Sequence, residues 1–285
     1  DLDDLLDERL RAGDVVLFKG SRTLGLERAA ERLLESVAPA RLRINLEAIR
    51  SNYHALRRHV GDDVGFIAVV KSFGYGNDSA RVSQTLVREG VDALAVAYAD
   101  EGIPLRQKGL DIPILVTNAL ASEADKIVKY GLSPFVYSDA VVDALRVQAR
   151  RFGRAVPVHL EVDTGMNRVG IEPSEAVEFA RKLVDYDEIE LAGILTHFAA
   201  ADDPAEDDFT RDQLRTFDSV IGELEQRGIE IEWVHAANTA AAWRWPEARY
   251  DSLRVGLGLY GLSPSEAVGR ETDHIQPAPA VIPSI

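Results

Sequence analysis

A lysine at the end of a hydrophobic segment is the residue of this chain best suited to covalent chemistry. The apolar and small residues from Gly65 to Val70 run directly into Lys71, and Tyr75 follows four residues later between two glycines. An apolar run of this length, rich in β-branched residues, predicts a strand buried on both faces. A lysine that is partly desolvated at the end of such a strand loses some of its preference for the charged form. It can then attack a carbonyl and hold it as a Schiff base.

The octamer Val69 to Gly76 resembles the lysine motif of bacterial alanine racemases, enzymes that depend on pyridoxal 5'-phosphate. The resemblance implies that Lys71 carries this cofactor as an aldimine and that Tyr75 touches the cofactor phosphate. A snorkelling surface lysine beside a Gly-Tyr-Gly turn is the alternative interpretation of these eight residues, because short motifs also occur by chance.

The composition is that of a globular protein with room for one large α/β domain or two smaller ones. No apolar stretch reaches the roughly 18 residues of a membrane span, and no N-terminal segment has the pattern of a signal peptide. The chain has no cysteine, which excludes disulfides and thiolate metal sites. A net charge of −15 argues against a nucleic-acid partner. We therefore expect a cytoplasmic enzyme that acts on a small molecule.

The charged residues are unevenly distributed by type, with 47 acidic residues against 32 basic ones, of which only 6 are lysines. An acidic surface that is poor in lysine is typical of proteins adapted to high salt. Base-composition drift in a GC-rich genome produces the same bias, and both explanations stay open.

From Ala40 onward the sequence alternates between strand-like and helix-like segments. Amphipathic helices are expected at 44–60, with Asn45 as a possible N-cap, and at 79–88, 99–108, 139–151, 173–183 and 207–226. Eight strands are expected at 65–70, 93–97, 113–117, 133–136, 157–162, 191–196, 231–235 and 252–256. Eight strand–helix repeats predict an α/β fold of the (β/α)8 TIM-barrel type. A doubly wound open sheet is the alternative, although no Gly-x-Gly-x-x-Gly follows the first strand.

Residues able to do chemistry follow the carboxyl ends of several expected strands, which in a barrel meet at one mouth. A short helix expected after the seventh strand also offers backbone N–H groups to a phosphate. The residues concerned are Lys71 and Tyr75 after the first strand, Arg168 after the fifth, His197 at the sixth, Asn238 and Thr239 after the seventh, and Arg254 and Gly256 in the eighth.

Four further segments resemble the racemase pattern. In Val158–Gly170 the resemblance gives Arg168 contact with the substrate carboxylate, and in Thr196–Ala199 it stacks His197 against the pyridine ring. It makes His235–Ala240 a phosphate-binding turn through Asn238 and Thr239. In Arg254–Leu257 it directs Arg254 to the pyridine nitrogen and the N–H groups of Gly256 and Leu257 to the phosphate. Taken singly, His197 is as well explained as a core histidine, and Arg254 as half of an ion pair. No histidine has zinc-ligand spacing, so no metal is expected.

Glu161 departs from the family pattern. Many relatives carry a lysine at this place, which is carbamylated and presents a negative group to the arginine. We expect Glu161 to supply that charge permanently and to orient Arg168 by a charge-assisted hydrogen bond. A residue of the barrel layer without this role is the alternative.

Three regions are expected along the chain. Residues 1–38, with a strand at 15–18 and a helix at 26–34, resemble the C-terminal end of the Mur ligase that adds D-alanyl-D-alanine to the peptidoglycan precursor. Residues 39–275 form the barrel that binds pyridoxal phosphate. Residues 276–285 look like the start of a C-terminal β domain that the chain lacks. The motif at Lys71 is similar to a racemase subgroup fused behind this ligase.

The resemblance implies an alanine racemase that interconverts L- and D-alanine for peptidoglycan synthesis. It also implies a homodimer with a shared active site, in which a partner tyrosine supplies the second base. Two alternatives stay open, a single-domain pyridoxal-phosphate-binding homeostasis protein and an amino-acid racemase of broader specificity. A chain that binds the cofactor but does not catalyse the reaction by itself is also compatible with the sequence.

Overall fold

A computed structural model describes residues 41–75, 79–271 and 281–284, which fall into two compact units. The larger unit spans Asn45 to Ala280, and the described part of the smaller one consists of its two flanking strands. The features expected at 15–18 and 26–34 lie outside the described residues, as do 276–280. The division at 1–38, 39–275 and 276–285 therefore stays a prediction.

The smaller unit contains a two-stranded antiparallel sheet made of β1 (Arg41–Ile44) and β10 (Val281–Ser284). Arg41 pairs with Ser284 and Ile44 with Val281. The predicted start of the first helix at Ile44 is wrong, because this residue ends a strand. Helix α3 (Leu46–Val60) begins two residues later, where the Asn45 side chain accepts a hydrogen bond from the Ala48 N–H at 3.2 Å, as the predicted N-cap requires.

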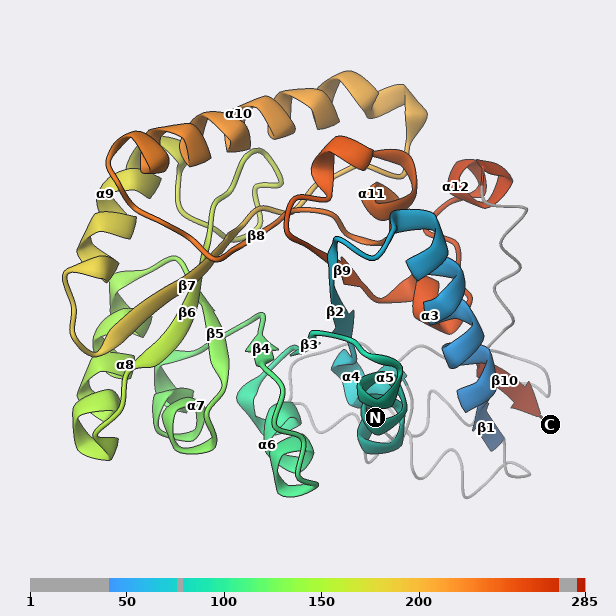
Figure 1. Ribbon diagram of the computed structural model, residues 1–285, viewed down its shortest axis with the longest axis horizontal. Helices are drawn as coiled ribbons and strands as arrows, with labels where there is room; N and C mark the ends of the chain where they lie inside the picture. The colour runs from blue at the N-terminus through green and yellow to red at the C-terminus, as the bar shows by residue number, and fades with distance from the viewer. Residues whose placement is uncertain (1–40, 76–78, 272–280, 285) are drawn as a thin grey trace, which may run out of the picture. The chain divides into compact units, whose positions relative to one another are not determined.

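The larger unit is a barrel of eight parallel strands in the order β8-β7-β6-β5-β4-β3-β2-β9 (Figure 1). The strands are β2 (Gly65–Val69), β3 (Ala93–Val96), β4 (Ile114–Val116), β5 (Ser133–Val136), β6 (Val156–Glu161), β7 (Ile189–Leu195), β8 (Trp233–His235) and β9 (Ser252–Val255). Two backbone hydrogen bonds cross the seam between β9 and the β8 segment, from Asp251 N to Val234 O at 3.1 Å and from Arg254 N to Ala237 O at 2.8 Å. The open-sheet alternative is therefore wrong.

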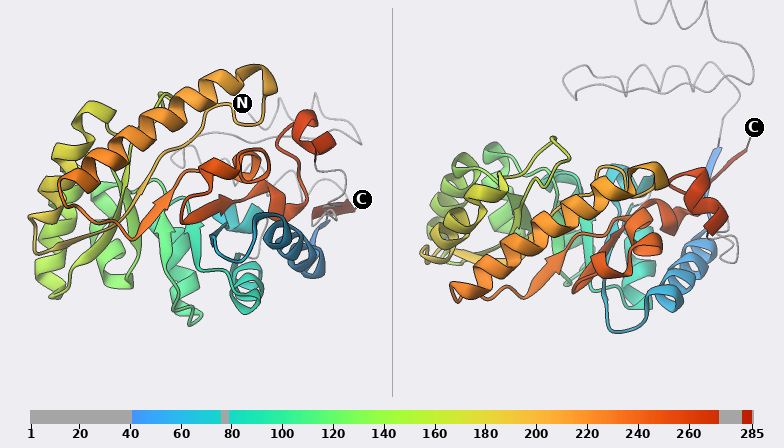
Figure 2. Two further views of the ribbon diagram at one scale, coloured as in Figure 1. Left: turned by 45° about the horizontal axis from the view of Figure 1, so that its top comes forward. Right: turned by 90° about the horizontal axis from the view of Figure 1, so that it is seen from above.

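Helices surround the strands of the barrel (Figures 1 and 2). The expected ones are α5 (Ser79–Glu89), α6 (Ala99–Gln107), α8 (Asp139–Phe152), α9 (Pro173–Val184) and α10 (Asp207–Gln226). Shorter segments are α4 (Lys71–Tyr75), α7 (Ala124–Tyr130), α11 (Thr239–Arg244), α12 (Glu266–Glu271) and the 3-10 helices η2 (Ala121–Glu123), η3 (Pro204–Glu206), η4 (Pro246–Ala248) and η5 (Leu257–Tyr260). None of the helices described here is long and apolar enough to cross a membrane.

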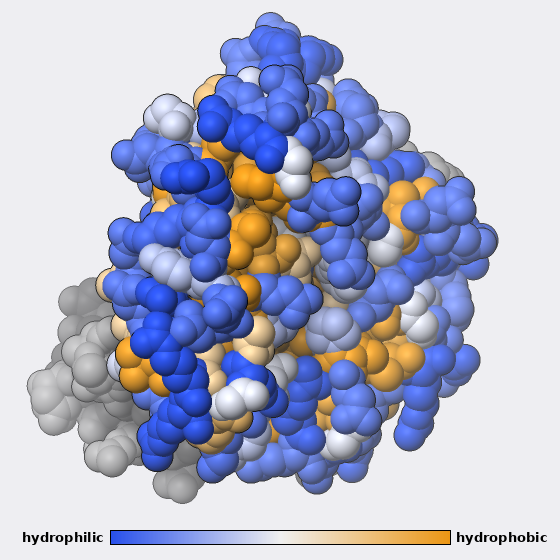
Figure 3. Space-filling model, turned by 60° about the vertical axis from the view of Figure 1, so that its left-hand side comes forward, coloured by the Kyte–Doolittle hydropathy of each residue, from blue (hydrophilic) through white to orange (hydrophobic). Residues whose placement is uncertain are grey.

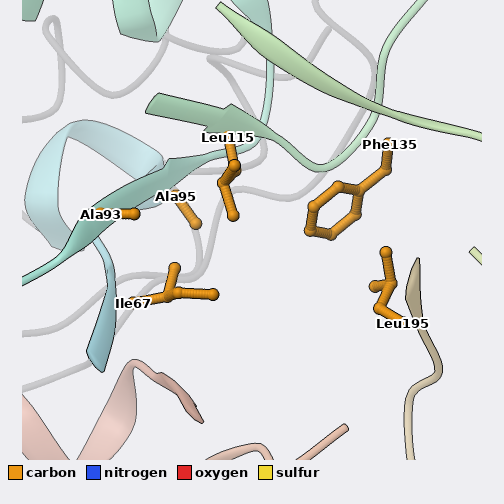
Figure 4. Close-up of a cluster of buried hydrophobic side chains, with 6 residues drawn as sticks. All are labelled: Ile67, Ala93, Ala95, Leu115, Phe135 and Leu195. Atoms are coloured by element: carbon orange, nitrogen blue, oxygen red, sulfur yellow. The ribbon is translucent and has the colours of Figure 1, made fainter. Parts of the chain in front are cut away.

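Side chains from five strands fill the barrel interior, as Figure 4 shows. The cluster combines small and large residues, so that the alanines of β3 make room for an aromatic ring from β5. Its members are Ile67, Ala93, Ala95, Leu115, Phe135 and Leu195, none of them more than 3% exposed. Such a packed interior leaves the ends of the strands as the place for polar chemistry. The outer face in Figure 3 is mainly hydrophilic, with hydrophobic side chains gathered in a central band.

One glycine in the barrel wall is required by its neighbour. The pairing of β6 with β7 shifts register between Val158 and His159, which brings Gly193 opposite His159. A Cβ atom at Gly193 would lie 2.2 Å from His159 Nδ1 and 2.8 Å from the carbonyl oxygen of Trp233. The register shift therefore places the one residue type that leaves space for the imidazole.

This geometry predicts opposite effects for two glycine-to-alanine substitutions. Gly193→Ala should lower the free energy of unfolding by roughly 1–3 kcal/mol, because the new methyl group overlaps the buried ring of His159 and the carbonyl oxygen of Trp233. Gly222→Ala is the control, since Gly222 lies in α10 and a methyl group added there would have nothing within 4 Å. It should raise the free energy of unfolding by up to about 1 kcal/mol. Urea unfolding of the three proteins measures both, and equal stability of Gly193→Ala and the parent would contradict the packing described.

Candidate active site

Lys71 lies at the mouth of the barrel. It directly follows Val70, whose N–H donates to the carbonyl oxygen of Ala95 on the neighbouring strand at 2.8 Å. It opens α4 and is followed by Ser72, whose φ of +56° is in the left-handed region. The Glu101 Oε2 atom accepts hydrogen bonds from the N–H groups of Ser72 at 3.3 Å and Ala97 at 3.0 Å, which holds this turn in place. Lys71 is exposed as a residue. Desolvation and then the positive charge of Arg168 lower the pKa of Lys71, against the opposing effect of Glu101.

The predicted arginine of the fifth strand lies on a short, closely bonded loop. The Asp163 carboxylate accepts from the N–H groups of Gly165 and Asn167, both at 3.0 Å, and Asn167 has a φ of +55°. A bridge between Val162 and Ile171 closes the loop. Arg168 is exposed and forms no hydrogen bond or ion pair with any residue the structure describes. The loop thus presents a guanidinium group available to an anion.

Arg254 is the buried cation of the site, with 6% of the residue exposed. Its Nη1 atom donates to His235 Nδ1 and His235 O, both at 2.7 Å. Its Nη2 atom donates to Thr196 O at 2.7 Å, Ala236 O at 3.0 Å and His197 Nδ1 at 3.3 Å. Burial lowers the pKa of Arg254 to about 10, so the group stays charged at neutral pH.

The Nε atom of Arg254 differs from the other two nitrogens. It has no hydrogen-bond partner among the described residues, yet it is not one of the completely shielded polar atoms. A buried guanidinium that is held at both Nη atoms therefore keeps one N–H donor for a ligand.

His197 follows β7 at the mouth of the barrel and accepts a hydrogen bond from Arg254. Burial first, and then the charges of Arg254, Arg168 and Lys71, lower the pKa of His197 to about 3. The imidazole is therefore neutral, and its Nδ1 atom accepts from Arg254. Because each of these charges acts on His197, the structure brings together four of the residues predicted to do chemistry: Lys71, Arg168, His197 and Arg254.

Glu161, at the end of β6, is only 4% exposed, and its Oε2 atom has no partner among the described residues. Burial raises the pKa of Glu161 to about 7 although the charges of Arg254 and Arg168 oppose the shift. The expected hydrogen bond from Arg168 to Glu161 is absent. Arg168 extends into solvent at the mouth while the carboxyl lies in the barrel wall, so the two interact only through their charges.

The predicted phosphate turn follows β8. Asn238 caps α11 by accepting from the Ala241 N–H at 3.0 Å. The Thr239 hydroxyl accepts from the N–H groups of Gly256 at 3.2 Å and Gly258 at 3.4 Å. The Gly256 N–H predicted to bind phosphate is thus already used by Thr239. Leu257 opens η5, so its own N–H has no partner within that helix.

Several residues that support the site were missed by the sequence analysis. Tyr137 directly follows β5, and burial first and then the charge of Glu161 raise its pKa, against the opposing effect of Arg168. Gln213 of α10 is fully buried and donates to His197 O at 3.2 Å and Thr164 Oγ1 at 3.3 Å. The position of Tyr137 after a predicted strand was a usable signal, whereas nothing in a helical Gln213 indicates its role. The backbone of Tyr75 lies in α4, and its side chain lies outside the described residues.

Comparisons with known proteins agree with this geometry. Residues 44–264 match the family model for the alanine racemase N-terminal domain. The alanine racemase of Symbiobacterium thermophilum is 36% identical over 236 residues, which are 82% of this chain and 62% of that protein. That of Methanococcus maripaludis is 38% identical over 237 residues, or 82% and 63%. The solved alanine racemase of Clostridium difficile superimposes with a TM-score of 0.81 at 32% identity, covering 86% of this chain and 67% of the other. The chain thus spans somewhat less than two thirds of the length of these curated relatives.

The burial of Glu161 predicts how stability depends on pH. The folded protein keeps a proton on this carboxyl up to a pKa of about 7, whereas the unfolded chain releases it near the ordinary value of 4.5. The contribution of Glu161 to stability therefore falls as the pH rises between these values. Glu161→Gln, which has no charge to bury, should match the parent near pH 4 and exceed it by roughly 2–3 kcal/mol above pH 7.

Urea unfolding of both proteins across this pH range measures the difference. Glu230→Gln is the matched control, because Glu230 is exposed and the same substitution there removes no buried carboxyl. A difference between Glu161→Gln and the parent that did not change with pH would contradict the description of a buried, neutral carboxyl.

Proposed function

Since this chain belongs to the family of the alanine racemase N-terminal domain, we propose that it forms the part of an alanine racemase that binds pyridoxal 5'-phosphate. The substrate is alanine, and the product D-alanine serves peptidoglycan synthesis. The observation that carries the proposal is the arrangement of Arg254, which is held at both Nη atoms and keeps Nε for a ligand.

The residues present fit the cofactor at each of its polar ends. The Arg254 Nε–H suits an acceptor such as the pyridine nitrogen, and the neutral ring of His197 lies beside it. The turn of Asn238 and Thr239, together with the N–H of Leu257, suits the phosphate, and we assign Tyr75 to the same end. The N–H of Gly256 instead holds the Thr239 hydroxyl in this turn. Lys71 across the mouth has a lowered pKa, which favours the neutral amine that a carbonyl requires.

Each residue then has a defined part in moving a proton at the substrate. When bound, pyridoxal phosphate draws electrons from the Cα of the amino acid, so that its proton becomes acidic. The Lys71 amine takes or returns this proton on one face of the Cα. Arg168 binds the substrate carboxylate, and the charge of Arg254 disfavours protonation of the ring nitrogen, which limits side reactions.

The unpaired guanidinium of Arg168 favours racemisation over simple storage of the cofactor. A carrier of pyridoxal phosphate needs groups for the ring and the phosphate, but it does not need a second cation for a carboxylate. Racemisation also needs an acid–base group on the opposite face of the Cα. We propose that a tyrosine of a partner subunit supplies it, in a homodimer with a shared active site. The fusion behind a Mur ligase belongs to the same proposal.

Reduction of the chain with borohydride in the presence of pyridoxal phosphate tests the central assignment. We expect mass spectrometry of the digested protein to find a pyridoxyl group on Lys71, because burial and the charge of Arg168 make its amine more neutral. Lys71→Ala should lose the label, and Lys108→Ala, a change at an exposed lysine on α6's C-terminal side, should keep it. A folded parent that gave no label at Lys71, or gave it equally at other lysines, would contradict the proposed function.

A further inference from the structure

Two buried histidines continue the hydrogen bonding of Arg254 into the barrel. His235, at the end of β8, is 0% exposed and His159, in β6, is 3% exposed. Arg254 Nη1 contacts His235 Nδ1 at 2.7 Å, and His235 Nε2 contacts His159 Nδ1 at 2.9 Å. The row Arg254–His235–His159 is here called the relay. Neither of its histidines has a part in any step assigned above.

The chemistry of arginine fixes the direction of the relay. A guanidinium only donates, so His235 Nδ1 must accept and the proton of His235 must lie on Nε2. His235 then donates to His159 Nδ1, which places the proton of His159 on Nε2 as well. Burial, together with the charge of Arg254, lowers the pKa of His159 to about 3 and that of His235 well below its usual value. Both rings are therefore neutral, and the three groups have one arrangement of protons.

The barrel wall is adapted to hold this row. The register shift between β6 and β7 sets Gly193 opposite His159, where any Cβ atom would overlap the imidazole. Phe135 lies against both rings, with centroids at 5.9 Å from His159 and 5.8 Å from His235. His159 also lines a cavity of about 310 Å³ at the amino-terminal end of the barrel. The relay thus extends from the mouth to the opposite end.

Neutral imidazoles have a different effect on Arg254 than carboxylates would have. A carboxylate in contact would hold the guanidinium more strongly but would also cancel its charge. No carboxylate of the described residues forms an ion pair with Arg254. We propose that His235 and His159 are positioning residues, which fix the orientation of Arg254 without neutralising it and keep its Nε–H directed at the ring nitrogen of the cofactor. This inference rests on the proposed function.

The proton arrangement can be measured in the whole chain without cofactor. Nitrogen-15 NMR of the histidine side chains should show His235 and His159 neutral, each with its proton on Nε2, at about pH 6 to 8, where an ordinary histidine titrates. A proton on Nδ1 of either ring, or a charged ring, would overturn the relay. The same spectra should show the Nη protons of Arg254 as separate signals, because rotation of the held guanidinium is slow.

Three variants test whether the relay positions Arg254. His235→Leu removes the acceptor, His159→Phe removes the second link while keeping a ring, and His235→Gln keeps both an acceptor and a donor. In the first two variants we expect the guanidinium of Arg254 to rotate faster, so that its separate Nη proton signals merge into an average. We also expect pyridoxal phosphate to bind roughly tenfold more weakly, with a shifted visible absorption of the bound cofactor. His235→Gln should restore the affinity and the spectrum toward those of the parent.

The outcomes separate the two proposals. Averaged Nη signals in His235→Leu and His159→Phe would support the positioning of Arg254 by the two histidines. If the parent bound no pyridoxal phosphate, that result would overturn the proposed function and the cofactor-directed part of this inference, but not the positioning itself. Variants that melted at a lower temperature but kept the parent's Arg254 signals, affinity and spectrum would show a purely structural role. That result would overturn the positioning role and leave the proposed function intact.

Discussion

The burial of one guanidinium at the carboxyl end of the barrel is the constraint on which the rest of the site depends. An unpaired cation cannot be buried without a large cost. Arg254 meets this requirement with three backbone carbonyls and two imidazoles, rather than with a carboxylate. The carbonyls belong to the last residue of β8 and to the segments that follow β7 and β8, so the seam of the barrel and the site are held by the same residue. The hydrogen bonds of its Nη atoms stabilise the fold, and its Nε–H stays available to a ligand.

The charge of Arg254 also determines the protonation of its neighbours. It acts with burial to keep His159, His197 and His235 neutral. It partly opposes the effect of burial on Glu161, whose pKa still rises to about 7. The site therefore contains a carboxyl that changes charge near neutral pH among imidazoles that do not. This is the reverse of the usual behaviour of these side chains, and it follows from burial around a fixed cation.

Much of the fold followed from the sequence, because a barrel repeats a simple pattern. The expected strands and long helices differ from the observed ones by at most two residues at either end. Strand ends also placed Lys71, His197 and Arg254 at one mouth. The pairing of Arg168 with Glu161 was wrong, because strand position predicts which end of the barrel a residue occupies but not how far its side chain extends. The relay through His159 depends on a register shift and on Gly193, and pairing between strands distant in sequence cannot be read from either strand alone.

Strain in the backbone is concentrated beside the two exposed cations. Of the described residues other than glycine, three have a positive φ, and Ser72 directly follows Lys71 while Asn167 directly precedes Arg168. Such conformations cost on the order of 1 kcal/mol or more each and persist only where surrounding contacts impose them. Here the Glu101 carboxylate bonds the N–H of Ser72, and the Asp163 carboxylate bonds that of Asn167. Two acidic groups thus hold the turns that present two cations, without forming ion pairs with them.

The cations at the mouth repel one another, which prepares the site for anions. The positive charge of Arg168 lowers the pKa of Lys71, and it acts on Arg254 in the same sense. The whole chain is strongly acidic, with a net charge of −15, so this positive potential is local to the mouth. A ligand that carries a phosphate and a carboxylate would relieve the repulsion among the three cations, and it would raise the pKa of Lys71 as it bound. The energy spent in holding like charges together is therefore recovered on binding, which favours a doubly anionic ligand over a neutral one of the same shape.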